Sequence, residues 1–162
     1  MIFVTVGTQV PFPRMMQAVS AWAVRHPDVE IVAQVGKGGG HYAGMRCHEL
    51  LRKDEFDELL ERATLLVSHA GMGSILSALT AGIPILVMPR KAALGEHRNE
   101  HQIATARAMH GKAGLTVAWE IEDLEASLSK GAWADGSISR LSPHAPAGFV
   151  AALRNLIESD SR

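Results

Sequence analysis

Small and polar residues follow a short apolar run near the middle of the chain, in the order Ser68, His69, Ala70, Gly71, Met72, Gly73 and Ser74. The apolar run, Leu65–Val67, has no polar alternation, as in a strand buried on both faces. Glycines at 71 and 73 permit a sharp turn and the close approach of a ligand to the backbone. A helix that begins here has free amide groups at the positive end of its dipole. The pattern predicts an anion site, usually for phosphate, and a glycine turn that serves packing alone is the alternative.

The densest polar run of the chain is Glu96, His97, Arg98, Asn99, Glu100, His101 and Gln102. On a helix from about His97 to His110, His97 and His101 share one face, as do Glu96 and Glu100. Three interpretations remain open. The two histidines can be read as a metal site, although a third nearby ligand is lacking and the order is not His-Glu-x-x-His. The run can also be a solvated helix start, or a set of carboxylate, amide and imidazole groups that bind a polyhydroxylated ligand.

A third polar turn, Gly7-Thr8-Gln9, follows the first apolar run of the chain. Because loops after parallel strands open at one edge of a sheet, we expect this turn to meet the segment 69–74 and the segment 90–102 there. Other chemistries fit less well, since the chain has no Gly-x-Ser-x-Gly elbow, no Gly-Lys-Ser/Thr phosphate loop and no Gly-x-Gly-x-x-Gly after the first strand. Nucleophilic catalysis by Ser68 and kinase or dehydrogenase activity are therefore disfavoured.

These turns require strands and helices that alternate along the chain. The expected strands are Met1–Val6, Val29–Val35, Leu65–Val67, Ile85–Val87 and Leu115–Ala118, with a further strand and its connection within Tyr42–Leu51. The expected helices are an apolar stripe from Phe12 to Ala23, then Asp54–Ala63, Ser74–Gly82, His97–His110 and Ile121–Leu128. This alternation predicts an α/β fold with a Rossmann-like parallel sheet covered by helices on both faces.

Two segments are expected to lie outside this framework. The glycine-rich segment Gly36–His41 predicts a loop that stays mobile until a ligand binds, and its Lys37 is either a phosphate contact or a solvated lysine. Gly131–Pro146 is expected to be irregular. The last helix is expected to carry an apolar stripe that docks on a partner or packs on its own domain, formed by Phe149, Leu153, Leu156 and Ile157.

Composition limits the class of protein. The chain has 162 residues, 47% hydrophobic and 20% charged, as expected for one globular domain spanning 1–162. Its formal charge of −1 gives no electrostatic signature of nucleic-acid binding. Cys47 is the only cysteine, so an internal disulfide is excluded and a reducing, cytoplasmic compartment is expected. No apolar run approaches the ~18 residues of a membrane span, and no signal-peptide pattern precedes the first strand.

Four segments in order, Met1–Gln9, Ser68–Ser74, Ala81–Pro84 and Gly95–Gln102, resemble the C-terminal domain of family-28 GT-B glycosyltransferases. The likeness is strongest to the single-domain bacterial exopolysaccharide glycosyltransferase subunits. Those subunits are similar to the cytosolic catalytic subunit of the eukaryotic dolichol-linked N-acetylglucosaminyltransferase. The resemblance runs from residue 1 to about residue 110 and is weaker beyond.

The resemblance implies that residues 1–162 form one UDP-sugar-binding domain, equivalent to one half of a GT-B enzyme. It puts Thr8 and Gln9 near the phosphates and the helix start Gly71–Ser74 at the diphosphate. The segment Glu100–Gln102 would reach the donor sugar. The remaining expected substrate-binding residues are His69, Ala70, Glu96, Arg98 and Asn99. Many relatives have a glutamate in the central helix that binds the ribose hydroxyls, whereas Ser77 occupies that position in this chain.

The resemblance also implies an activity, that of an inverting, metal-independent hexosyltransferase without a cofactor. The sugar would pass from a UDP-sugar to a polyprenyl-diphosphate-linked acceptor in surface or exopolysaccharide synthesis. A membrane-anchored partner would hold the acceptor, supply the general base and keep the chain at the inner face of the plasma membrane. If the apolar stripe of the last helix is a docking surface, its exposed area would favour a homo-oligomer in the isolated chain until the partner covers it. The alternatives are a non-catalytic, nucleotide-sugar-binding regulatory subunit and a GT-B-like sugar epimerase, which is disfavoured because a second domain is not seen.

Overall fold

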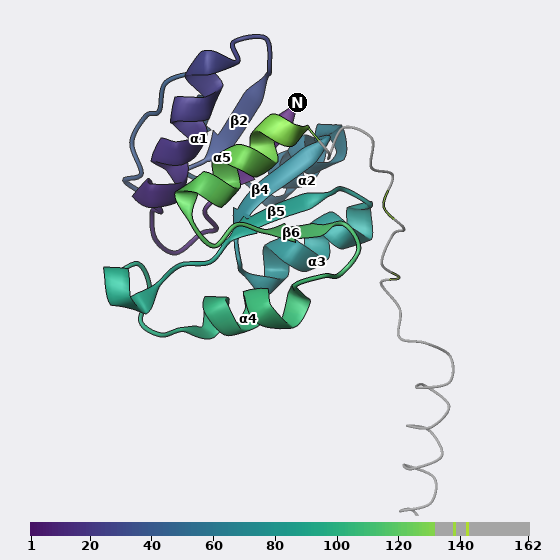
Figure 1. The fold of residues 1–162 in the computed structure, drawn as a ribbon. Coiled ribbons are helices and arrows are strands. Elements are labelled where there is room, and N and C mark those ends of the chain that lie inside the picture. The colour runs from purple at the N-terminus through teal and green to yellow at the C-terminus, as the bar shows by residue number, and fades with distance from the viewer. Residues whose placement is uncertain (132–137, 139–141, 143–162) are drawn as a thin grey trace, which may run out of the picture.

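The computed structural model describes residues 1–131, 138 and 142. Its strands are β1 (Ile2–Thr5), β2 (Ile31–Gln34), β3 (Arg46–His48), β4 (Leu65–His69), β5 (Ile85–Met88) and β6 (Leu115–Val117). Its helices are α1 (Pro13–Arg25), α2 (Lys53–Arg62), α3 (Met72–Ala81), α4 (His101–Met109) and α5 (Ile121–Lys130), with a 3₁₀ turn η1 (Ala92–Leu94). In this part of the chain the six strands form one parallel sheet in the order β3-β2-β1-β4-β5-β6. Figure 1 shows β4, β5 and β6 next to one another in this order. The predicted Rossmann-like α/β fold is confirmed.

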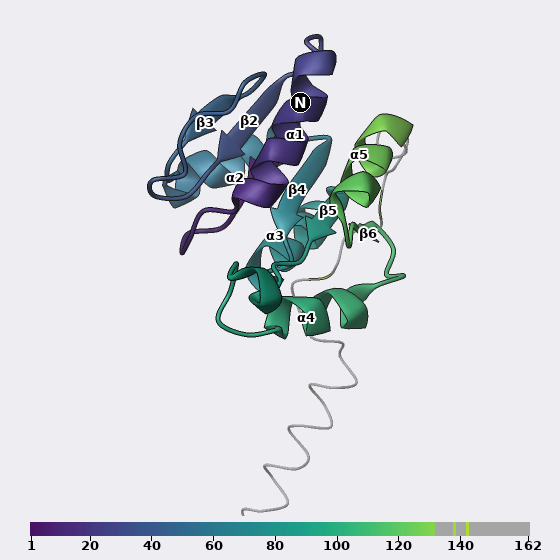
Figure 2. The same cartoon turned by 60° about the vertical axis from the view of Figure 1, so that its left-hand side comes forward.

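Helices cover both faces of the sheet (Figure 2). Because side chains alternate between the two faces of a strand, Ile2 and Val4 of β1 enter one core and Phe3 enters the other. The first core is closed by α1 and α5, which contribute buried side chains such as Trp22 and Leu124. The second core is closed by α2, α3 and α4, with Leu59, Leu60, Ile75, Leu79 and Ala106. Both layers of helices therefore hold the strand ends in fixed positions.

The order of the strands reverses between β1 and β4. From β1 the chain continues to β2 and β3 on one side, and then returns to add β4, β5 and β6 on the other. At such a switch point the loops after the two central strands diverge and leave a crevice at their carboxyl ends. The turn after β1 and the start of α3 after β4 border this crevice, and residues of the segment 90–102 line it as well, so the three polar segments found in the sequence meet at this edge.

The boundaries of several elements agree with the sequence pattern. Gly82 ends α3 in the left-handed region with φ +77°, where its amide donates to the carbonyls of Ala78 and Leu79. The segment 36–41 is a loop, as expected, and its mobility stays a prediction. Among the described residues, no helix has the length and apolar character that a membrane span requires. The stripe expected on the last helix lies outside the described residues, as does most of the segment 131–146.

One predicted boundary is wrong. The helix expected from about His97 begins at His101, and residues 96–100 form a non-helical bend. The Asn99 side chain accepts a hydrogen bond from the backbone amide of His101 at 3.2 Å, which is the kind of local bond that fixes the chain outside a helix. As a result, His97 and His101 do not share a helix face, and neither do Glu96 and Glu100.

Candidate functional site

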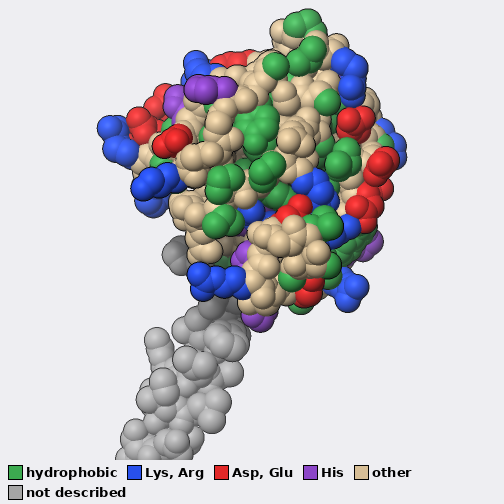
Figure 3. Space-filling model, turned by 90° about the vertical axis from the view of Figure 1, so that its left-hand side faces the viewer, with side chains coloured by type: hydrophobic (Ala, Val, Ile, Leu, Met, Phe, Trp, Pro, Cys, Tyr) green, Lys and Arg blue, Asp and Glu red, His purple; other side chains and the backbone are tan. Residues whose placement is uncertain are grey.

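A cleft of about 690 Å³ opens at the carboxyl ends of the central strands. Its walls are Thr5, Val6, Gly7, Thr8, Gln9, Val10, Gln34, Leu51, Lys53, Phe56, Asp57, His69, Gly73, Ser74, Ser77, Arg90, His97 and Gln102. On the face of the molecule shown in Figure 3, Lys and Arg side chains are interspersed with Asp, Glu and apolar ones. A surface of mixed charge attracts no ligand class by its general field, so recognition depends on groups within the cleft.

The start of α3 forms one wall of the cleft. Gly73 and Ser74 lie in its first turn and line the cavity, and a Cβ atom added at Gly73 would meet open space. No side chain of the described residues caps this helix and its first turn has no acidic residue, whereas α2 and α5 have both a capping box and acidic first turns. The free amide groups of α3 therefore point toward the cleft with the positive end of the helix dipole. This arrangement suits an anionic ligand.

The imidazole of His69 is wedged between two glycines. A Cβ atom on Gly71 would lie 2.2 Å from Nε2 of His69, and one on Gly7 would lie 2.8 Å from Cε1. Gly7 is also in the left-handed region with φ +83°, so both its space and its backbone favour glycine. Burial, followed by the positive charge of Arg90, lowers the pKa of His69 to about 4. His69 is therefore neutral at physiological pH and serves the cleft as a polar, uncharged group.

The amide side chain of Gln34 connects two rims of the cleft. It is 2% exposed at the end of β2, and its Nε2 donates to the carbonyl of Gly7 at 2.9 Å and to Oγ1 of Thr5 at 3.2 Å. Its Oε1 accepts a hydrogen bond from the amide of Leu51 at 3.1 Å. One buried side chain thus fixes the turn after β1 and the segment that leads into α2, and a buried polar group so fully bonded makes both rims rigid.

The guanidinium of Arg90, two residues after the end of β5, lies beneath the loop that follows β1. Arg90 is 2% exposed, and it donates to the carbonyls of Val6 at 3.0 Å, Val10 at 2.7 Å and Pro11 at 2.8 Å. It also lies over the ring of Phe12, 4.5 Å from the centroid. Burial lowers the pKa of Arg90 to about 10, so the group stays charged at neutral pH. It fixes the loop and places a positive charge next to the cleft.

Glu96 is engaged by a distant arginine and does not line the cleft. Nε and Nη2 of Arg14 donate to its two carboxylate oxygens at 2.6 and 2.8 Å, and the amide of Lys91 donates to it at 2.8 Å. Burial acts to raise the pKa of Glu96, but these hydrogen bonds outweigh it and hold the pKa below its usual range. The carboxylate therefore joins the loop after β5 to α1, and its contact with substrate stays a prediction.

The structure divides the other residues expected to bind substrate into two groups. Those that line the cleft are Thr8, Gln9, His69, Gly73, Ser74 and Gln102. Those that do not line it are Ala70, Gly71, Met72, Arg98, Asn99, Glu100 and His101. Ala70 is buried in the core, Gly71 is the N-cap residue of α3, and Met72 is 46% exposed. The rest point to solvent because the chain bends before α4 begins.

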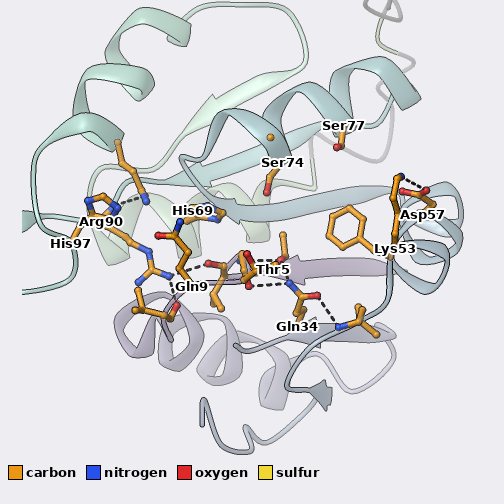
Figure 4. A pocket seen from close by; sticks show the side chains of 18 residues that line it. Thr5, Gln9, Gln34, Lys53, Asp57, His69, Ser74, Ser77, Arg90 and His97 are labelled. Carbon is orange, nitrogen blue, oxygen red and sulfur yellow. Dashed lines mark hydrogen bonds and ion pairs between the residues drawn. The ribbon is translucent and has the colours of Figure 1, made fainter. Parts of the chain in front are cut away.

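The cleft also contains residues that the sequence did not single out as site residues. These include Gln34, Lys53, Phe56, Asp57 and Arg90. His97 also lines the cleft, and it belongs to the polar run that the sequence offered as a metal site or a site for a polyhydroxylated ligand. Figure 4 shows His97 and Arg90 at one end, Lys53 and Asp57 at the other, and His69 and Ser74 between them. A polar residue at the carboxyl end of a buried strand, such as Gln34, was the signal available in the sequence. The described residues contain no group of three or more His, Cys, Asp and Glu side chains suitably placed for a metal ion.

Related sequences are known. The model of the family described as the glycosyltransferase family 28 C-terminal domain matches residues 1–137. A UDP-N-acetylglucosamine transferase subunit ALG13 from Cryptococcus neoformans is 33% identical over 84 residues, which make up 51% of this chain and 40% of that protein. The chain thus spans less than half of the length of this curated relative.

Solved structures share the fold. The NMR solution structure of ALG13 superposes with a TM-score of 0.59 at 20% identity, covering 88% of this chain and 90% of that one. The crystal structure of the glycotransferase of kitacinnamycin superposes with a TM-score of 0.61, also at 20% identity, covering 80% of this chain and 34% of that one. At these identities the likeness concerns the fold alone.

Proposed function

This chain belongs to the glycosyltransferase family 28 C-terminal domain family, and we propose that it is the donor-binding, catalytic subunit of a UDP-sugar-dependent hexosyltransferase. The observation that carries the proposal is the uncapped start of α3, which opens into a cleft at the switch point of a parallel sheet. A diphosphate fits this position because the free amides of the first turn and the helix dipole both favour an anion. Relatives named as UDP-N-acetylglucosamine transferase subunits support the choice of a UDP-sugar.

The two ends of the cleft differ in chemistry, and we assign them to the two ends of the donor. Leu51 and Phe56 give one end apolar walls, next to the carboxylate of Asp57 and the hydroxyl of Ser77. This end suits a nucleoside, whose base needs an apolar contact and whose ribose hydroxyls need acceptors. In this assignment Asp57 and Ser77 share the ribose contact that a single glutamate makes in many relatives. The opposite end carries polar groups and suits the sugar.

The proposed reaction is an inverting displacement. A hydroxyl oxygen of the acceptor forms a bond to the anomeric carbon, while the bond from that carbon to the diphosphate oxygen breaks and its electron pair leaves with UDP. The start of α3 stabilises the negative charge that develops on the leaving diphosphate. Because fixed dipoles can do this, we propose that transfer requires no divalent metal. The acceptor proton passes to a general base on a second polypeptide.

The acceptor and the cellular setting belong to the proposal as well. We propose that the acceptor is linked to polyprenyl diphosphate and that the product enters surface or exopolysaccharide synthesis. A membrane-anchored partner would supply the acceptor-binding half and keep the chain at the inner face of the plasma membrane. The support is the resemblance in the four sequence segments, together with relatives named as transferase subunits.

Ligand binding and turnover test different parts of the proposal. UDP at 100 times its dissociation constant should raise the unfolding free energy by about 2.7 kcal/mol, measured as thermal protection. Co-expression with a candidate partner encoded nearby, followed by an assay of UDP release from UDP-N-acetylglucosamine with a polyprenyl-diphosphate acceptor, tests catalysis. Thermal protection without UDP release in the reconstituted membranes would favour a nucleotide-sugar-binding regulatory subunit. Absence of protection by UDP or UDP-sugars would refute the donor-site assignment.

A further inference from the structure

His97 lies in the cleft although the fold takes its neighbours away from it. It lines the cavity beside Arg90 and Gln102, at the end opposite Lys53 and Asp57 (Figure 4). His101, four residues later, is exposed on the outside of α4. The bend at residues 96–100 therefore selects one histidine of the pair for the cleft.

The hydrogen bonds of Asn99 determine which nitrogen of His97 carries the proton. The Oδ1 atom of Asn99 accepts a hydrogen bond from the backbone amide of His101 at 3.2 Å, and a backbone amide can only donate. That atom is therefore an oxygen, and it lies 3.1 Å from Nδ1 of His97. An oxygen acceptor there requires a proton on Nδ1, so the neutral imidazole keeps a lone pair on Nε2.

The neighbouring Gln102 is oriented by the same kind of constraint. Its Oε1 accepts a hydrogen bond from the backbone amide of Arg90 at 3.1 Å, so its Nε2 amide group remains as a donor. No partner for Nε2 of either His97 or Gln102 occurs within the described part of the chain. An acceptor and a donor thus stand side by side at the polar end of the cleft, which is the pattern that hydroxyl groups complement.

We propose that His97 is a sugar-binding residue: in the neutral tautomer that Asn99 selects by binding the Nδ1 proton, Nε2 accepts a hydrogen bond from a hydroxyl of the transferred sugar. The amide of Gln102 donates to a neighbouring hydroxyl oxygen. This assignment rests on the proposed function, since it takes the diphosphate to lie at the start of α3. It replaces Glu100 and His101, which the structure leaves outside the cleft. A site that bonds hydroxyls in this way discriminates against sugars that lack them.

The test compares the dissociation constants of UDP, UDP-glucose and UDP-N-acetylglucosamine for the wild-type chain and a set of variants. His97→Phe should weaken a UDP-sugar about 2–10-fold relative to UDP, the value of one hydrogen bond. His97→Gln should retain the wild-type ratio, because the glutamine amide reaches the position of Nε2. His97→Asn should not, because asparagine reaches only the position of Nδ1. His101→Phe is the matched control and should change none of the three constants.

The outcomes separate this assignment from the proposed function. If the wild-type chain binds no UDP or UDP-sugar, the proposed function fails and the role of His97 fails with it. If the wild-type chain binds these ligands and His97→Phe keeps the wild-type ratio, only the role of His97 is refuted. Should His97→Phe fail to fold, the comparison of His97→Gln with His97→Asn decides, and equal ratios in those two variants would overturn the assignment.

Discussion

Replacement of Gly73 by valine should weaken nucleotide binding strongly, by about 100-fold in the dissociation constant, without unfolding the chain. A Cβ atom at Gly73 meets no atom within 4 Å in the protein, and the position is in the first turn of α3, so the fold has room for the side chain. Valine is even slightly better than glycine in a helix, by roughly 0.3 kcal/mol. The new methyl groups instead occupy the cleft, where a phosphate oxygen would approach the amide of residue 73.

The size of the effect follows from ligand linkage. UDP at 100 times the wild-type dissociation constant adds about 2.7 kcal/mol, which for a domain of this size raises the melting temperature by roughly 5–11 °C. If Gly73→Val binds UDP 100-fold more weakly, the same concentration adds about 0.4 kcal/mol, or roughly 1–2 °C. Differential scanning fluorimetry with and without UDP measures both values, and circular dichroism shows whether the variant is folded.

Gly71→Ala provides the contrast, because its Cβ atom would lie 2.2 Å from Nε2 of His69. Overpacking of this kind costs about 1–3 kcal/mol, so this variant should melt at a lower temperature even without ligand. The two substitutions should therefore have different effects: Gly73→Val should weaken UDP binding, and Gly71→Ala should lower the stability of the fold. A folded Gly73→Val chain that UDP protects as strongly as the wild type would refute the placement of the diphosphate at α3.

Three further predictions concern the residues around this helix. Arg90→Met should lower the unfolding free energy by about 3 kcal/mol in urea denaturation, because three carbonyls lose a buried donor, and Arg90→Lys should lose less. The pKa of His69 is about 4 in the folded chain against 6.5 unfolded, so its contribution to stability is complete above pH 6.5 and is lost as the pH falls toward 4. The unfolding free energy lost in this way reaches about 3 kcal/mol. Between pH 7 and pH 4.5, the unfolding free energy of His69→Gln should therefore fall less than that of the wild type. Gln102→Ala should weaken UDP-sugar binding about 2–10-fold more than UDP binding. Glu100→Ala should change both affinities little, since Glu100 is exposed and, in the described part of the chain, bonds only the amide of Ala92. Isothermal titration calorimetry with UDP and a UDP-sugar measures both affinities for each variant.

Local interactions explain why so much of the framework could be predicted. The strand β4, the turn at Gly71 and the end of α3 at Gly82 depend on backbone preferences and on hydrophobic periodicity, which are properties of neighbouring residues. The fold class followed from the alternation of these elements, and the edge that carries the cleft followed from the parallel order of the strands. The four sequence segments likewise indicated the family that the comparison found.

Contacts between residues far apart in the sequence decide which side chains line the cleft. Glu96 forms an ion pair with Arg14, 82 positions away, and Arg90 donates hydrogen bonds to carbonyls about 80 positions before it. A periodic pattern cannot reveal such partners, because it records only which face of its own element a residue occupies.

The selection of His97 over His101 has the same origin. A helical pattern treats the two alike, but the loop after β5 is held by Arg14 through Glu96, and α4 starts only after Asn99 has bonded the amide of His101. The sequence thus determined which polar segments meet at the sheet edge, because that depends on strand order and local turns. Only the tertiary structure decided which side chains of those segments reach the cleft. Buried charged and amide groups must form hydrogen bonds, and their partners can lie at any distance along the chain.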